Sequence, residues 1–255
     1  MSIWGIIPAA GLGTRIQPLA FSKELLPVGT RRDGETDRPR AVCEYLIDRM
    51  LLAGATRICF VISPEKADIM NYFGGRIADA AICYAIQQNP TGLCDAIFTA
   101  LPFLSSDDDV LIGLPDTVWF PENGFHFLPE RTFSFLLFPV DRPELFDAVV
   151  TDDNGRVREV QVKTPGATSN WVWGAFRMPS QDLENLYQLW LEREKQDQYI
   201  GTLVNEYINR GATVRAVRRG QRYVDVGTLH GYREAVNLLS RDDRPLTQLP
   251  LNVAA

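Results

Sequence analysis

The stretch IIPAAGLGTRIQPLAFSKELLPV, residues 6–28, begins as a β-strand and runs directly into a glycine-rich turn. A turn of this kind exposes backbone N–H groups, which suit phosphate oxygens. Two standard phosphate-binding patterns do not fit it. A dinucleotide-binding fold needs a third glycine where the chain has Ile16, which disfavours an NAD-dependent enzyme. A P-loop needs a lysine followed by Ser or Thr where the chain has Thr14-Arg15.

What remains is a glycine turn followed by two cations, Arg15 and Lys23. Two cations and a row of backbone amides carry more positive charge than one phosphate needs. They suit a triphosphate whose pyrophosphate end must be stabilised as it leaves. The alternative is a glycine turn with incidental surface cations.

Outward from this loop, the first half of the chain alternates short β-branched runs with helical patterns. We expect strands at 3–9, 57–62, 81–86 and 109–114, and helices at 41–54, after Ser63-Pro64 and at 93–103. This βαβα order predicts an α/β fold in which a mixed, mostly parallel sheet has helices on both faces. The charged segment 30–40 is expected to be a mobile surface loop.

The second half predicts a smaller α+β part. Its expected elements are a strand at 133–140, a hairpin over 147–162 that turns at Asn154-Gly155, a strand at 171–178, helices at 181–195 and 199–210, short strands at 213–218 and 222–226, and a helix at 229–239. Residues 241–255 are expected to form an irregular tail.

The composition is ordinary for a soluble globular protein, with 45% hydrophobic and 23% charged residues. A net charge of −6 disfavours a nucleic-acid binder. No apolar run approaches the roughly 18 residues of a membrane span, and the start does not resemble a secretory signal, so we expect a cytoplasmic protein without a membrane partner. Its four cysteines, Cys43, Cys59, Cys83 and Cys94, form no C-x-x-C pair and are expected to be buried free thiols rather than disulfides or a metal site.

Residues 9–28, AAGLGTRIQPLAFSKELLPV, resemble the signature loop of the sugar-1-phosphate nucleotidylyltransferases, also called nucleotide-sugar pyrophosphorylases, notably the glucose-1-phosphate thymidylyl- and uridylyltransferase branches. Further resemblances follow in the expected order in DRPRAVCEYLIDRMLLAGATRICFVIS, QQNPTGLCDAI, LPDT and YVDVGTLHGYREA. The resemblance covers residues 3–239. It implies a Rossmann-like nucleotidyltransferase domain over 1–240, with a nucleotide-binding half over 1–120 and an acceptor-binding half over 121–240.

The implied reaction joins an NTP and a sugar 1-phosphate to give an NDP-sugar and pyrophosphate, by in-line attack of a sugar-phosphate oxygen on the α-phosphorus. Such a transfer needs positioning and charge neutralisation more than acid–base help. The only two histidines, His126 and His230, lie in no recognisable triad. The alternative is a catalytically silent homologue that binds nucleotide or sugar phosphate for regulation; retention of the charged residues favours the enzyme.

The resemblance also implies roles for residues of the nucleotide half. Asp116 and Asp225 each follow an apolar run and would share one Mg²⁺; otherwise each simply caps a turn. Arg15 would grip the β- and γ-phosphates, and Lys23 would balance charge near the α-phosphate and the leaving group. The remaining nucleotide contacts would be Ala10, Gly11, Gly13 and Thr14 at the phosphates and Gln87 and Gly92 at the base, although Gln88 leaves that register open by one residue.

In the acceptor half, Lys163 matches the lysine that holds the phosphate of the sugar 1-phosphate. Its surroundings depart from the family pattern: Val162 replaces a glutamate that bonds sugar hydroxyls, Phe146-Asp147 replaces Tyr-Gly, and Trp173 precedes Gly174 where a small residue is usual. The segment DQYIGTLVNEY also has no glutamate at the place where the family has one. Each lost hydrogen bond costs about 1–3 kcal/mol. We therefore expect an altered acceptor pocket, including Asp147, Val162, Lys163 and Gly174, that takes a modified sugar phosphate or another phosphorylated alcohol. The favoured nucleotide is dTTP or UTP, and a homo-oligomer is possible.

Overall fold

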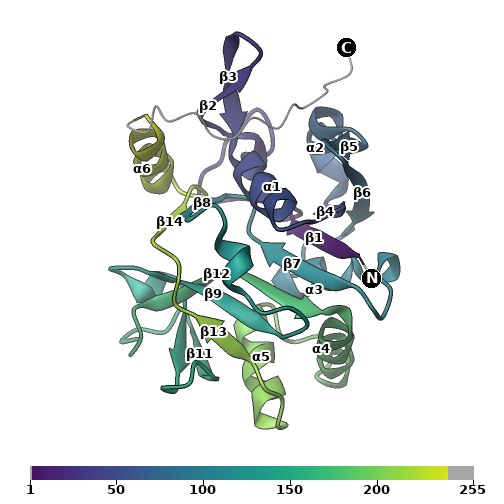
Figure 1. Ribbon diagram of the computed structural model, residues 1–255, viewed down its shortest axis with the longest axis vertical. Helices are drawn as coiled ribbons and strands as arrows, with labels where there is room; N and C mark the ends of the chain where they lie inside the picture. The colour runs from purple at the N-terminus through teal and green to yellow at the C-terminus, as the bar shows by residue number, and fades with distance from the viewer. Residues whose placement is uncertain (1, 241–255) are drawn as a thin grey trace.

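The computed structural model describes residues 2–240. Its centre is a ten-stranded mixed sheet (Figure 1), in the order β11-β10-β12-β7-β1-β4-β6-β5, with β9 paired to β12 and β13 paired to β9. Its strands are β1 (Ile3–Pro8), β4 (Arg57–Ile62), β5 (Arg76–Ile77), β6 (Ala80–Ile86), β7 (Asp109–Gly113), β9 (Ser134–Pro139), β10 (Asp147–Thr151), β11 (Val157–Val162), β12 (Trp171–Pro179) and β13 (Arg215–Val217). Strands β7, β1, β4 and β6 are parallel, and β12 joins them antiparallel to β7. The predicted mixed, mostly parallel sheet is confirmed.

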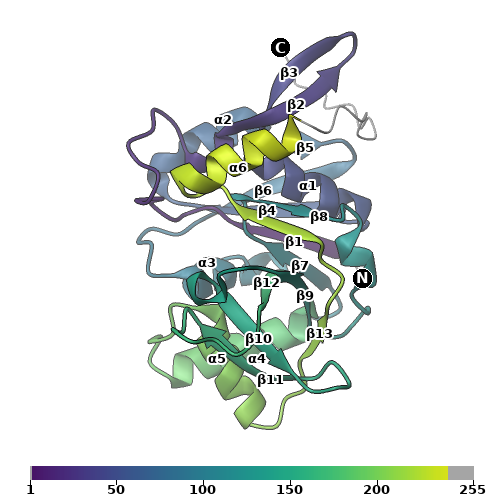
Figure 2. The ribbon, with the colours of Figure 1, turned by 90° about the vertical axis from the view of Figure 1, so that its left-hand side faces the viewer.

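Helices cover both faces of this sheet (Figure 2). Helices α1 (Val42–Leu52) and α2 (Ala67–Phe73) pack on one face, and α3 (Leu93–Phe98), α4 (Ser180–Glu192) and α5 (Ile200–Asn209) pack on the other. Strand β4 shows why the sequence requires this arrangement. Its adjacent residues Phe60 and Val61 are both fully buried but belong to different cores, one on each face. A strand that is apolar on both sides needs a helical layer on each.

The charged segment 30–40 is not the mobile loop that its composition suggested. It forms most of an antiparallel hairpin, β2 (Pro27–Asp33) and β3 (Thr36–Ala41), which projects from the body of the molecule (Figure 1). Gly34 supplies the positive φ of +61° in its turn, and Arg38 pairs with Asp33 at 2.8 Å. Residues 32–39 of this hairpin are all exposed, so this part of the ribbon needs no apolar face. Its strands therefore carry no hydrophobic period for sequence reasoning to detect.

Two predicted helices differ in their bounds. The helix expected over 93–103 ends as α3 at Phe98 and is followed by a separate 3₁₀ turn, Leu101–Phe103, because Pro102 cannot donate the backbone hydrogen bond that would continue it. Ser63-Pro64 opens a 3₁₀ turn, Pro64–Lys66, without a side-chain cap, and α2 begins only at Ala67.

The hairpin of β10 and β11 is confirmed, with Gly155 at φ +74° in its turn. The final helix is also confirmed as α6 (Leu229–Leu239), capped by the Thr228 hydroxyl, which accepts from the Gly231 N–H at 3.0 Å. The division of the domain near residue 120 stays a prediction, since β7 and β12 from the two halves share one sheet. The predicted tail at 241–255 lies outside the described residues.

All four cysteines are free thiols, as expected, although Cys83 is only half-buried. Within residues 2–240, no helix combines the length and the apolar character needed to cross a membrane.

Candidate active site

A small second sheet brings two aspartates together. Strand β8 (Thr117–Phe120) directly follows Asp116, and β14 (Arg222–Asp225) ends at Asp225. The two strands pair antiparallel with Thr117 opposite Asp225, and the Val226 N–H donates to the Asp116 carbonyl at 2.8 Å. This pairing places side chains from distant parts of the chain at one end of the sheet.

The two carboxylates point at the same small space. A methyl group built on Gly227 would lie 2.6 Å from Asp116 Oδ2 and 2.9 Å from Asp225 Oδ1. The Gly227 N–H itself donates to Asp225 Oδ1 at 2.8 Å, which fixes the orientation of that carboxylate. Only a glycine leaves this space open.

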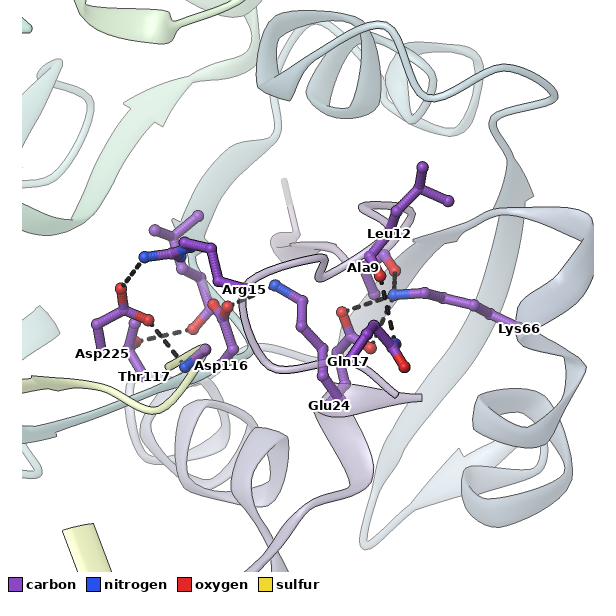
Figure 3. A network of polar contacts seen from close by, with 12 residues as sticks. Ala9, Leu12, Arg15, Gln17, Glu24, Lys66, Asp116, Thr117 and Asp225 are labelled. Atoms are coloured by element: carbon purple, nitrogen blue, oxygen red, sulfur yellow. Dashed lines mark hydrogen bonds and ion pairs between the residues drawn. The ribbon is translucent and has the colours of Figure 1, made fainter. Parts of the chain in front are cut away.

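Each carboxylate is paired with a cation from the glycine-rich loop. Lys23 Nζ lies 2.5 Å from Asp116 Oδ2, and Arg15 Nη1 lies 2.8 Å from Asp225 Oδ2. Figure 3 shows Arg15 reaching from the loop toward Asp225, with Asp116 beside it. The side chain of Lys23 is 14% exposed and that of Arg15 is 61% exposed. Lys23 is therefore enclosed, whereas Arg15 is free to meet a ligand from solvent.

The electrostatics keep Asp116, Lys23 and Arg15 charged at neutral pH. Burial disfavours the ionised carboxyl of Asp116, but the charge and hydrogen bond of Lys23 outweigh it, so the pKa of Asp116 lies below its usual value. Burial also disfavours the Lys23 ammonium, yet the charges of Asp116 and Glu24 raise the Lys23 pKa. The Arg15 pKa is raised in the same way by Asp225, against partial burial.

The predicted phosphate-binding residues line the loop after β1. Ala10 is buried at the end of the strand, whereas Gly11 and Thr14 lie on the exposed loop. Gly13 has φ +64°, and a methyl group there would lie 2.7 Å from Lys23 Cδ. Gly13 thus lets the Lys23 stem pass beneath the loop.

Gln87 and Gly92 are held by contacts within the protein. Gln87 is 4% exposed, and its amide donates to Asp95 Oδ2 at 2.6 Å. Gly92 has φ +132°, and a methyl group on it would lie 2.8 Å from the backbone of Gln198. Packing alone explains a glycine at position 92, and the base contact of both residues stays a prediction.

The residues that depart from the family pattern in the acceptor half lie next to one another. Asp147 is opposite Val162 across β10 and β11, and the Trp173 indole N–H donates to Asp147 Oδ2 at 3.2 Å. Burial raises the pKa of Asp147, against the hydrogen bond from Trp173 and the charge of Lys163. The Lys163 ammonium lies 4.5 Å from the centre of the Tyr199 ring.

Gly174 has a packing reason of its own. A methyl group on it would lie 2.5 Å from the Tyr223 ring and 2.7 Å from the Phe138 ring. The close packing of the Tyr223 and Phe138 rings against β12 therefore requires a glycine here, and a contact of Gly174 with the acceptor stays a prediction.

The pair of aspartates fits the predicted magnesium ion. Across the part of the chain that the structure describes, no three Asp, Glu, His or Cys side chains cluster as a metal cage. Mg²⁺ in nucleotide sites is usually held by only one or two carboxylates, together with substrate phosphates and water. Asp116 and Asp225 supply that donor set.

Comparison with known proteins identifies the family of this chain. The nucleotidyl transferase family model matches residues 4–242. Curated relatives include a glucose-1-phosphate thymidylyltransferase of Neisseria meningitidis, 28% identical over 92% of this chain and 82% of the relative, and the UTP–glucose-1-phosphate uridylyltransferase AglF of Haloferax volcanii, 25% identical over 95% and 99%. The UTP-bound UGPase of Acinetobacter baumannii has the same fold, with a TM-score of 0.74 at 21% identity over 93% of each chain.

The chain therefore belongs to the nucleotidyl transferase family. This confirms the resemblance to sugar-1-phosphate nucleotidylyltransferases seen in its motifs, and with it the prediction that the protein is an enzyme.

Proposed function

We propose that this enzyme transfers a nucleoside monophosphate from dTTP or UTP to a sugar 1-phosphate or a related phosphorylated alcohol, releasing pyrophosphate. The observation that carries the proposal is the meeting of Asp116, Asp225, Arg15 and Lys23 beside the glycine-rich loop. The names of the relatives support a pyrimidine nucleotide and a sugar 1-phosphate. A cytoplasmic location and a homo-oligomer are parts of the same proposal.

In this site, Arg15 would bind the β- and γ-phosphates, since its exposed guanidinium offers donors beyond the one used by Asp225. Lys23 uses one donor on Asp116 and has two left for the α-phosphate and the leaving pyrophosphate. The backbone amides of the loop would hold the phosphates in line. A magnesium ion on Asp116 and Asp225 would supply further neutralisation of phosphate charge.

The acceptor pocket follows from the pairing of Asp147 with Trp173. Trp173 occupies Oδ2 of Asp147, which leaves Oδ1 to accept from a donor group of the acceptor. Val162, directly opposite, offers only an apolar wall. The hydrogen-bonding group of this pocket therefore comes from β10 rather than from β11, and Lys163 would hold the acceptor phosphate. We infer that the enzyme selects an acceptor other than ordinary glucose 1-phosphate.

A matrix of NTPs and phosphorylated acceptors, with Mg²⁺ and release of pyrophosphate as the readout, tests this function. We expect turnover with dTTP or UTP and a preferred acceptor that is used more efficiently than glucose 1-phosphate. Equal or better efficiency with glucose 1-phosphate would refute the altered pocket. Silence across the whole matrix with tight nucleotide binding would instead identify a regulatory homologue.

Asp147→Asn separates recognition of the acceptor from folding. We expect kcat/KM for the acceptor to fall about 10- to 100-fold, the range of a lost hydrogen bond to a charged group, with little change in KM for the NTP. Burial raises the folded-state pKa of Asp147 above its unfolded-state pKa. The free energy of unfolding therefore falls as the pH rises from the unfolded-state pKa to the folded-state pKa, and the ionised side chain destabilises the fold at higher pH. Asparagine should therefore maintain or raise the melting temperature at neutral pH. Kinetics and thermal melting check both parts.

The control is Asp141→Asn, an exposed aspartate nearby in sequence, which should change neither quantity. Loss of stability in Asp147→Asn without a selective loss in acceptor kcat/KM would contradict the assignment.

A further inference from the structure

Three consecutive residues of the loop, Ser22-Lys23-Glu24, are each bound by the side chain of a different residue. The Ser22 N–H and hydroxyl donate to Asp68 at 2.6 and 2.7 Å. Lys23 pairs with Asp116, and Glu24 accepts two hydrogen bonds of 2.8 Å from Lys66. The turn that carries Lys23 is thus fixed on both sides by side chains from the segment at 64–68.

Lys66 also holds the start of the same loop. Its ammonium donates to the carbonyl of Ala9 at 2.6 Å, just after β1 ends. Figure 3 shows Lys66 reaching both Ala9 and Glu24, on the side of the loop away from Asp225. All three N–H donors of one lysine are therefore used to join the two ends of the loop that carries Arg15 and Lys23.

Stability alone does not explain this ion pair. Glu24 is 0% exposed and Lys66 7% exposed. Burial raises the pKa of Glu24 and lowers that of Lys66, so each charged form is disfavoured by its surroundings. Apolar side chains of similar volume often serve a fold equally well or better than a buried ion pair.

We propose that Lys66 and Glu24 are positioning residues that hold the loop at 9–24 so that Lys23 and Arg15 meet the triphosphate. Glu24 directly follows Lys23 in a short 3₁₀ turn, Lys23–Leu25, so fixing the Glu24 carboxylate fixes the direction in which Lys23 leaves the backbone. This inference depends on the proposed function, because the positioned groups are those assigned to the phosphates.

The test replaces both partners by methionine, Glu24→Met together with Lys66→Met, which leaves no unpaired charge. We expect the melting temperature to remain near that of the wild type and kcat to fall about 100-fold, the scale of a small misplacement of reacting groups. KM for the acceptor should change little. If the ion pair has only a structural role, kcat should instead be retained in every variant whose melting temperature is retained.

A second readout does not depend on activity. Arg15 lies on the exposed part of the loop, so trypsin cleavage after Arg15 should be faster in the double variant. The single variant Lys66→Arg, which keeps a charged donor, should show slower cleavage and higher kcat than the double variant. Equal cleavage in the wild type and the double variant would refute the positioning role, even if the double variant were less stable.

The matched control removes another buried ion pair, Arg177 and Asp109, whose atoms lie 2.6 Å apart. Asp109 is the first residue of β7 and Arg177 lies on the neighbouring strand β12, whereas Asp116 follows the other end of β7. Arg177→Met with Asp109→Leu should leave kcat of the folded enzyme and cleavage after Arg15 unchanged. An inactive wild type would overturn the proposed function; an active wild type with an equally active double variant would overturn only the positioning role.

Discussion

Asp116→Asn should lower kcat about 100- to 1000-fold, the loss seen when one pre-organised charge-stabilising group is removed, while the fold stays assembled. Asp116 is 6% exposed, and Lys23 holds its pKa low, so it acts as a full negative charge. Asparagine keeps the shape of the side chain but removes that charge. Lys23 then loses its counter-ion, and the space next to Gly227 loses one of its two carboxylates. Steady-state kinetics with the preferred substrates, alongside circular dichroism, measure the effect.

Asp107→Asn is the control for this change, because Asp107 is exposed and lies just before β7 rather than just after it. Its kcat should equal that of the wild type. Near-wild-type turnover in Asp116→Asn would contradict the role of this aspartate, and an unfolded variant would show up in the dichroism spectrum.

Gly227→Ala should have an effect of similar size, although it removes no charged or polar group. The added methyl would lie 2.6 Å from Asp116 Oδ2 and 2.9 Å from Asp225 Oδ1, closer than carbon and oxygen atoms pack. Either the two carboxylates move apart, or the methyl group fills the space between them. Since misplacement by about 1 Å can cost roughly 100-fold in rate, we expect at least that loss in kcat, together with weaker binding of Mg²⁺ in the presence of nucleotide. Kinetics and calorimetric titration of the ion check the two effects.

Gly75→Ala provides the comparison for Gly227→Ala, since a methyl group on Gly75 has no atom within 4 Å. It should retain wild-type kcat and ion affinity. If Gly227→Ala also retained both, the two aspartates would not share an ion at this point.

The elements that sequence reasoning placed best have a strong local signal. Strand β4 and helix α6 have the bounds expected for them, because one is a continuous apolar run after Arg57 and the other follows a capping threonine. Strand β8 was not predicted, although a short strand was expected at 222–226, where its partner β14 lies. Strand β8 consists of four residues immediately after Asp116, and β14 lies far along the chain. Tertiary contacts decide that two such distant short strands pair, so the sequence of neither segment predicts the pairing.

The same distinction applies to the site. The sequence predicted Arg15, Lys23, Asp116 and Asp225 as one group, and the structure brings them together; their catalytic roles stay predictions. It gave no sign of Lys66, which in SPEKAD reads as a surface lysine but is buried against Glu24. It also named Asp147 and Trp173 as separate departures, whereas they are hydrogen-bonded partners. Gly227 could have been found, because it follows Asp225 by two residues in a turn that must approach the carboxylates closely.

A crystal structure of the protein with dTTP or UTP and Mn²⁺, used in place of Mg²⁺ for its anomalous signal, tests the central claim most directly. We predict one ion bound by a carboxylate oxygen from Asp116 and one from Asp225, with the triphosphate along the loop beside Arg15 and Lys23. An ion bound by neither or only one of these aspartates, or a triphosphate away from residues 9–15, would contradict the account.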